Sequence, residues 1–342
     1  MDSIYDDPEV DPDTGALLVA PGQIIQGTDG DDLFNLVEGD EYQGGYDREA
    51  GEFIGAVTVD AGDGDDVIDF DDPAANDGNG FYIFNSELNG GAGNDTITAS
   101  GDSLRIAGEE GDDTIFVRGT SCLSGGAGDD TLRGESRFTD MSTFYGGSGD
   151  DTLDGRGMDN VGLYGGEGED TILTSEHGPA GTGYVVLADG GEGDDRLIHD
   201  APAQGYSSKP PILFGGEGSD SFEIGIVDCP TDPTVAASRQ TNVVLLGDFD
   251  RDEDTLQITL DVSDPSYSVT SAQMVEQPYR VSVDASGMPI YGTETHINVT
   301  YEHDTENDRQ MTVVVRDTGL TWDDVNFVGD VQPNVFQPVA TV

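Results

Sequence analysis

An eight-residue pattern of glycine and aspartate recurs nine times between residues 27 and 222, and it constrains the fold more than any other feature. In every copy the fourth residue is Gly, the sixth is Asp and the eighth is Leu, Ile or Phe, as in "GGAGDDTL". The copies cover residues 27–34, 61–68, 90–97, 108–115, 125–132, 146–153, 165–172, 190–197 and 215–222. Such self-similarity is typical of an array of stacked units and argues against a disordered chain.

Apolar residues occupy two fixed places in this pattern. One is the eighth position, and the other lies two residues before each copy. The residues before the copies are Ile25, Val59, Leu88, Ile106, Leu123, Phe144, Leu163, Ala188 and Leu213. The eighth-position residues are Phe34, Ile68, Ile97, Ile115, Leu132, Leu153, Ile172, Leu197 and Phe222. This placement predicts a glycine-rich turn between two short strands, each with an inward side chain. Helix is disfavoured, because a glycine costs about 1 kcal/mol relative to Ala in a helix.

The spacing of the copies predicts how the coils stack. Successive sixth-position aspartates are 34, 29, 18, 17, 21, 19, 25 and 25 residues apart. The shortest spacings indicate a coil of about 18 residues, with one acidic turn on one edge and an ordinary turn on the other. Stacked coils would bring every acidic turn to the same edge. The extra residues of the longer spacings are then expected as insertions at the opposite edge.

The acidic turns have the chemistry of a Ca²⁺ site. Calcium takes six to eight oxygen ligands from carboxylates and carbonyls, whereas Mg²⁺ demands a stricter octahedron. Zinc would require clusters of His or Cys, which these turns lack. Glycine allows a turn to adopt positive φ and aim its carbonyls at a shared ion. The residues before the ligand aspartates are expected to modulate the electrostatic field at the ion and to keep the edge of the stack solvated. They are Asp31, Asp65, Asn94, Asp112, Asp129, Asp150, Glu169 and Asp194.

The nine copies resemble the RTX (haemolysin-type) nonapeptide repeat GGxGxDxUx over about residues 24–225. The resemblance implies an all-β fold, a right-handed parallel β-roll, with Ca²⁺ between successive turns and at most about eight such sites. The implied ligand aspartates are Asp32, Asp66, Asp95, Asp113, Asp130, Asp151, Asp170, Asp195 and Asp220. The implied glycines are Gly90, Gly93, Gly108, Gly111, Gly125, Gly128, Gly146, Gly149, Gly165, Gly168, Gly190, Gly193, Gly215 and Gly218.

Three turns depart from the repeat. Thr28 and Glu109 replace the second Gly, and Ala61 replaces the first, so weaker binding is expected there. The long spacings around Asp66 leave open whether the first turns bind calcium at all.

The net charge of the chain excludes two classes of partner. Asp and Glu number 70 against 13 Lys and Arg, which gives a formal charge of −57. Such a field repels nucleic acid and anionic membrane surfaces. No apolar run of about 18 residues is present, so no membrane-spanning helix is expected. Surface solvation in a salty medium is an alternative reason for part of the acidity.

The two cysteines, Cys122 and Cys229, are far apart in the sequence and form no metal or disulfide motif. We expect them to be buried free thiols, although pairing between them stays open.

The sequence outside the repeats predicts two flanking regions. Residues 1–23 are expected to form an acidic arm or cap, because an open end of a stack exposes strand edges. Residues 226–342 are predicted to form a linker and a β-rich cap, since 279–284, 296–303 and 310–317 alternate apolar and polar residues. The last two segments predict a hairpin. An EF-hand loop at Asp248 is disfavoured, because Glu253 replaces the glycine that this loop requires.

The C-terminal region also bears on secretion. The segment 319–330, "GLTWDDVNFVGD", resembles the ending of many RTX proteins, and we expect Trp322 to be a packing residue. The start of the sequence lacks a cleavable signal pattern. Together with the resemblance, this implies a type I exporter that reads an uncleaved C-terminal signal.

No enzyme motif is present in the sequence. None of His177, His199, His296 and His303 belongs to an HExxH motif, and no GxSxG elbow occurs. We therefore expect a secreted, extracellular or cell-surface calcium-binding structural protein without catalytic activity, able to self-associate. The alternative is a calcium-stabilised adhesin or polysaccharide-binding module that uses the inserted loops. Their aromatic residues, expected more to pack on the roll than to form a recognition face, are Tyr42, Tyr46, Phe81, Tyr82, Tyr184 and Tyr206. An extracellular enzyme is the least favoured interpretation.

Overall fold

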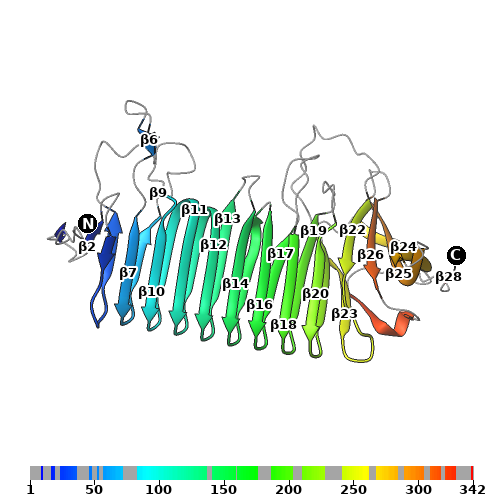
Figure 1. Cartoon of the computed structure of the whole chain (residues 1–342). Helices are drawn as coiled ribbons and strands as arrows, with labels where there is room; N and C mark the ends of the chain where they lie inside the picture. The colour runs from blue at the N-terminus through cyan, green and yellow to red at the C-terminus, as the bar shows by residue number, and fades with distance from the viewer. Residues whose placement is uncertain are drawn as a thin grey trace. The chain divides into compact units, whose positions relative to one another are not determined.

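A computed structural model of the chain shows parallel strands that alternate with tight turns (Figure 1). The structure describes residues 9–10, 17–19, 24–36, 46–47, 52–53, 57–71, 83–136, 141–158, 160–175, 186–202, 210–227, 241–261, 267–283, 289–303, 309–316, 320–328 and 340–341. The chain divides into two compact units, Met1–Asp170 and Thr171–Val342, which we call the N-terminal and C-terminal units. Each is described by itself.

In the N-terminal unit, the strands before the turns form one parallel ladder. Its members, in order, are β3 (Ile24–Gln26), β7 (Thr58–Asp63), β10 (Glu87–Ala92), the second halves of β11 (Thr96–Glu110) and β12 (Thr114–Ala127), β14 (Ser142–Ser148) and β16 (Val161–Glu167). The register aligns the apolar residue that precedes each copy with its equivalent on the next strand, for example Leu88 with Ile106 and Leu123 with Phe144.

The strands after the turns, together with β2 at the N-terminal end, form a second parallel ladder in the same unit. They are β2 (Leu17–Val19), β4 (Leu33–Leu36), β8 (Val67–Phe70), the first halves of β11 and β12, β13 (Thr131–Ser136) and β15 (Thr152–Met158). Here the eighth-position residues align, as Ile115 does with Leu132. Four further short strands are described in this unit. They are β1 (Glu9–Val10) beside β2, β9 (Ile83–Phe84) beside β11, and the pair β5 (Tyr46–Asp47) and β6 (Glu52–Phe53).

The predicted core is confirmed. All eighteen side chains that the sequence placed inward are at most 3% exposed. They come from both ladders, and each lies in register with its equivalents. Successive residues of a strand point to opposite faces, so a fixed spacing around a turn of fixed length keeps the apolar side chains on one face. The fold is the expected all-β parallel β-roll.

The C-terminal unit also contains two parallel ladders. One contains β18 (Val186–Glu192), β20 (Ile212–Glu217), β22 (Thr241–Leu246) and β26 (Arg309–Val315). The other contains β17 (Thr171–Ser175), β19 (Arg196–Pro202), β21 (Ser221–Val227), β23 (Thr255–Asp261) and β27 (Val325–Val328). The strand pairing therefore does not stop at the predicted border at residue 225.

Antiparallel strands complete this unit. The strand β24 (Tyr267–Val283) pairs with β25 (Pro289–His303), which pairs with β26. The pairing of β25 with β26 confirms the hairpin predicted for the segments 296–303 and 310–317. The short β28 (Ala340–Thr341) lies beside β24, and a 3₁₀ turn, η2 (Trp322–Asp324), precedes β27. The Trp322 ring packs at 5.9 Å from that of Phe327, as expected for a packing residue. Nowhere in the described part of the chain is a helix long and apolar enough to cross a membrane.

The expectation of a buried thiol was wrong for Cys122, which is exposed and free. The reason is strand alternation, because its neighbour Leu123 points inward and Cys122 must then point outward. Cys229 lies outside the described residues, as do five of the six aromatic residues of the predicted inserted loops and the side chain of Tyr46.

Replacing Leu132 by Ala tests the core. Leu132 is fully buried, so Leu132→Ala should lower the free energy of unfolding by about 2–5 kcal/mol. The exposed neighbour Thr131 provides a matched control, and Thr131→Ala should change it by no more than about 0.5 kcal/mol. Urea unfolding in the presence of calcium measures both. Equal effects of the two substitutions would contradict the assigned register.

Candidate metal-binding turns

Within each unit, the predicted ligand aspartates form a column of stacked turns at one edge of the ladders, and these turns lie at the lower edge in Figure 1. In the N-terminal unit, the backbone N–H of each of these residues donates to Oδ1 of the equivalent aspartate in the following turn. The bond from Asp95 to Asp113 is 2.7 Å long, and the bonds from Asp113 to Asp130 and from Asp130 to Asp151 are 2.8 Å. The column begins with Asp32 bonded to Asp66 and ends with Asp151 bonded to Asp170. In the C-terminal unit Asp195 bonds to Asp220 in the same way, at 2.9 Å.

The interior carboxylates of this column are buried with one oxygen unsatisfied. They are at most 1% exposed, and their Oδ2 atoms have no hydrogen-bond partner. These residues are Asp66, Asp95, Asp113, Asp130 and Asp151. Burying an oxygen without a partner costs free energy, and burying a charge costs more. In its ionised form the column therefore requires a positively charged group beside each Oδ2.

Burial also shifts the pKa of these carboxyl groups. Loss of water raises the pKa of Asp95, Asp113 and Asp130 to about 6 and that of Asp151 to about 7. The pKa of Asp66 is raised as well, again chiefly by burial. Nearby negative charges add to the shift, such as that of Asp130 beside Asp113. Without a cation, these groups therefore resist ionisation.

The first residue of the repeat is a glycine in every copy but the second, where Ala61 replaces it, and this glycine forms a cradle for such a cation. A Cβ atom added at Gly108 would overlap Oδ2 of Asp113 and lie 2.8 Å from the carbonyl oxygen of Gly125 in the following turn. At Gly146 the equivalent atom would overlap Asp151 Oδ2 and lie 2.6 Å from the Gly165 carbonyl oxygen. A charged carboxylate oxygen and a carbonyl oxygen from the next coil thus lie around the same glycine. These hard oxygen donors fit Ca²⁺.

The second and fourth glycines allow the turns to stack closely. Gly126 and Gly128 have φ of +132° and +131°, which residues with a Cβ rarely adopt. A Cβ atom at Gly128 would also overlap the carbonyl oxygen of Gly111 in the preceding turn. Glu109, which replaces a second glycine, still takes a positive φ of +87°. Glu109 therefore keeps the backbone conformation of the other turns, although a positive φ is unfavourable for a residue with a Cβ atom.

The residues before the ligand aspartates do more than the sequence suggested. The backbone N–H of each donates to a side-chain oxygen of its equivalent in the preceding turn, opposite in direction to the aspartate column. The bonds from Asp112 to Asn94, from Asp129 to Asp112 and from Asp150 to Asp129 are each 2.9 Å long. These exposed side chains therefore join successive turns in addition to solvating the edge. An acceptor is required at this position, which explains why Asn94 can replace Asp.

A tenth acidic turn follows the nine copies, and its aspartate, Asp254, was not among the predicted ligands. The N–H of Asp220 donates to Oδ1 of Asp254 at 2.9 Å, which continues the column in the C-terminal unit. Asp248 accepts the N–H groups of Gly215 and Gly216 at 2.9 and 3.1 Å. The signal was the segment "DTL" at residues 254–256, which matches the end of "GGAGDDTL". The absence of glycine at the second and fourth positions concealed it.

The raised pKa values predict opposite pH responses with and without calcium. In calcium-free protein, the folded state holds protons that the unfolded state releases above pH 3.8. The resulting stabilisation is complete below that pH and is lost as the pH rises through about 6 to 7. Protons compete with Ca²⁺ for the same oxygens, so calcium affinity should fall between pH 7.5 and 5.5. Calorimetric titration measures the affinity, and an unchanged affinity would contradict burial of these ligands.

Comparison with known families supports the chemistry of these turns. A family model for the RTX calcium-binding nonapeptide repeat, in four copies, matches residues 84–115, 123–136 and 142–161. Searches among curated proteins and among solved structures gave no match. The matched segments contain Asp95, Asp113, Asp130 and Asp151, four of the buried carboxylates described above. Residues 84–161 therefore contain RTX calcium-binding nonapeptide repeats, folded as successive coils of a parallel β-roll.

Proposed function

We propose that this protein is a secreted calcium-binding structural or cell-surface protein whose β-roll folds when Ca²⁺ binds between its turns. The observation that carries the proposal is the column of buried aspartates whose Oδ2 atoms have no partner. The repeat family found at residues 84–161 supports calcium as the ion. No catalytic role is assigned to any residue.

Each residue of an interior turn has a distinct part in holding the ion. Oδ1 of Asp113 accepts the N–H of Asp95, which fixes the carboxylate and leaves Oδ2 directed at the cradle. The Gly125 carbonyl reaches the same cradle from the next coil. Bound calcium supplies positive charge that offsets the repulsion between stacked carboxylates. Since the donors come from two coils, binding would favour their stacking.

Calcium concentration would then control where the protein folds. Each site adds RT ln(1 + [Ca²⁺]/Kd) to the stability of the folded state. With a net charge of −57, the calcium-free chain repels itself strongly. We propose that the chain remains unfolded where calcium is scarce, passes through a type I exporter, and folds outside the cell.

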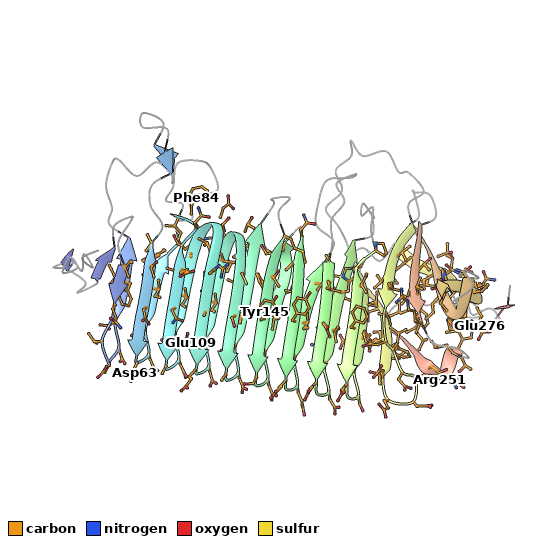
Figure 2. All side chains as sticks on the ribbon, viewed as in Figure 1. Asp63, Phe84, Glu109, Tyr145, Arg251 and Glu276 are labelled. Atoms are coloured by element: carbon orange, nitrogen blue, oxygen red, sulfur yellow. The ribbon has the colours of Figure 1, made fainter. Side chains whose placement is uncertain are left out.

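A second candidate function, binding of a polysaccharide, is favoured by an exposed aromatic pair. Tyr145 is 45% exposed on the strands (Figure 2) and stacks on Tyr164, with ring centroids 5.2 Å apart and planes at 17°. On the other neighbouring strand, β12, the residue in register with Tyr145 is the small Ser124. One ring face of Tyr145 thus has no aromatic neighbour in register, and a flat sugar ring could stack there.

Calcium removal tests the proposed function. Excess EGTA should remove most of the β-sheet signal in circular dichroism, and added CaCl₂ should restore it. The physical reason is that the buried carboxylates repel one another once their counter-charge is gone. Magnesium at the same concentration serves as the control and should restore much less signal. A metal-free protein that keeps its full β-sheet signal would overturn the calcium-dependent fold.

The second candidate has its own test. Affinity electrophoresis against a panel of neutral polysaccharides would reveal saturable binding, which Tyr145→Ala should weaken at least tenfold. Thr143, on the same strand, provides the matched control Thr143→Ala. If no glycan binds while calcium produces polymers detectable by light scattering, the structural role is supported over the binding module.

A further inference from the structure

In two turns the second carboxylate oxygen of the aspartate, Oδ2, accepts hydrogen bonds, unlike in the interior turns described above. In the first turn of the N-terminal unit, Oδ2 of Asp32 accepts the Thr28 N–H at 2.7 Å and the Thr28 hydroxyl at 3.0 Å. In the tenth turn, in the C-terminal unit, Oδ2 of Asp254 accepts the Asp250 N–H at 2.7 Å. In both turns the donor lies four residues before the aspartate. The Oδ2 atoms of the interior turns from Asp66 to Asp151 have no such partner.

Backbone conformation at the donor position separates the two kinds of turn. In the interior turns the residue four before the aspartate has a positive φ. These residues are Gly62 (+111°), Gly91 (+115°), Glu109 (+87°), Gly126 (+132°) and Gly147 (+129°). Thr28 and Asp250 do not have positive φ. Where the residue four before the aspartate lacks a positive φ, its N–H therefore donates to Oδ2. Where that residue has a positive φ, Oδ2 has no hydrogen-bond partner.

The position of the oxygen changes accordingly. A Cβ atom added at Gly90, Gly108 or Gly125 would overlap Oδ2 of its own aspartate. At Gly27 the same atom would overlap the Ala61 carbonyl oxygen of the next coil and lie 2.8 Å from Asp32 Oδ2, which accepts the Thr28 N–H. Asp32 is also only half-buried, so water solvates it further. The first turn therefore keeps the carbonyl oxygen of the cradle, but its carboxylate oxygen lies farther from the glycine and is already hydrogen-bonded.

The tenth turn is closed by additional contacts. Both carboxylate oxygens of Asp248 accept backbone N–H groups of the ninth turn, from Gly215 and Gly216. The Phe249 side chain is buried and packs on Phe222, with ring centroids 5.8 Å apart. Hydrogen bonds and apolar packing thus hold this turn in place, where an interior turn leaves a buried oxygen without a partner.

From these contacts we infer that the first and tenth turns are closed by hydrogen bonds, and that Asp32 and Asp254 hold no calcium. Calcium is confined to the interior turns, where positive φ keeps Oδ2 free. The Thr28 and Asp250 N–H groups supply at the two outer turns the positive partial charge that an ion supplies elsewhere. The inference rests on the proposed function, since it locates the ions within the same column.

Four matched substitutions test this inference by the number of calcium ions bound per chain. Asp113→Asn and Asp130→Asn keep an oxygen for the ladder bond but remove the charged ligand, and each should lower the number by at least one. Asp32→Asn and Asp254→Asn should leave it unchanged. Native mass spectrometry at saturating calcium gives the number, and circular dichroism checks that each variant is folded.

A fifth variant provides a gain of binding. Thr28→Gly removes the hydroxyl and permits positive φ, so it should add one bound ion, whereas the control Thr28→Ser should add none. Loss of an ion from Asp32→Asn or Asp254→Asn, or no gain in Thr28→Gly, would overturn the inference while leaving the proposed function intact. A wild-type protein that binds no calcium would overturn both.

Discussion

The burial of one carboxylate per turn is the constraint on which the rest of the structure depends. Each interior aspartate uses Oδ1 to join its turn to the preceding one, and this contact places Oδ2 where neither water nor a protein donor reaches it. Burial raises the pKa of these groups, to about 6 for Asp113, because an isolated charge is costly in such a place. A divalent cation shared by two turns resolves this cost. The same arrangement therefore accounts for the stacking of the turns and for the dependence on calcium that we propose.

The rest of each coil serves to bring these carboxylates into register. Inward apolar residues such as Leu123 and Leu132 hold the two strands at a fixed distance from the turn. Glycine is required where the backbone of one turn approaches the next, as at Gly128 against the Gly111 carbonyl. The exposed residues before the aspartates add a second set of bonds that runs in the opposite direction. Two sets of hydrogen bonds between turns and two rows of inward apolar side chains thus specify one stacking register.

Much of this arrangement could be predicted from the sequence, because strand alternation and a turn of constant length fix which side chains point inward. Alternation also gives the exposed position of Cys122. The wrong expectation, a buried Cys122, was based instead on the usual burial of free cysteine. The hydrogen bonds between turns could not be predicted, since they depend on the distance and direction between neighbouring coils. The turn at Asp254 was hidden for a related reason. It keeps the aspartate and the following apolar residue but replaces the glycines with hydrogen-bonded acids.

A crystal structure grown with calcium, or with terbium as an anomalous substitute, would test the central claim most directly. The account predicts a metal peak between successive interior turns, about 2.3–2.6 Å from Oδ2 of Asp113 and from the carbonyl oxygen of Gly125. Equivalent peaks should follow at Asp95, Asp130 and Asp151. A folded structure in which these Oδ2 atoms contact only water or protein at saturating metal would contradict the account.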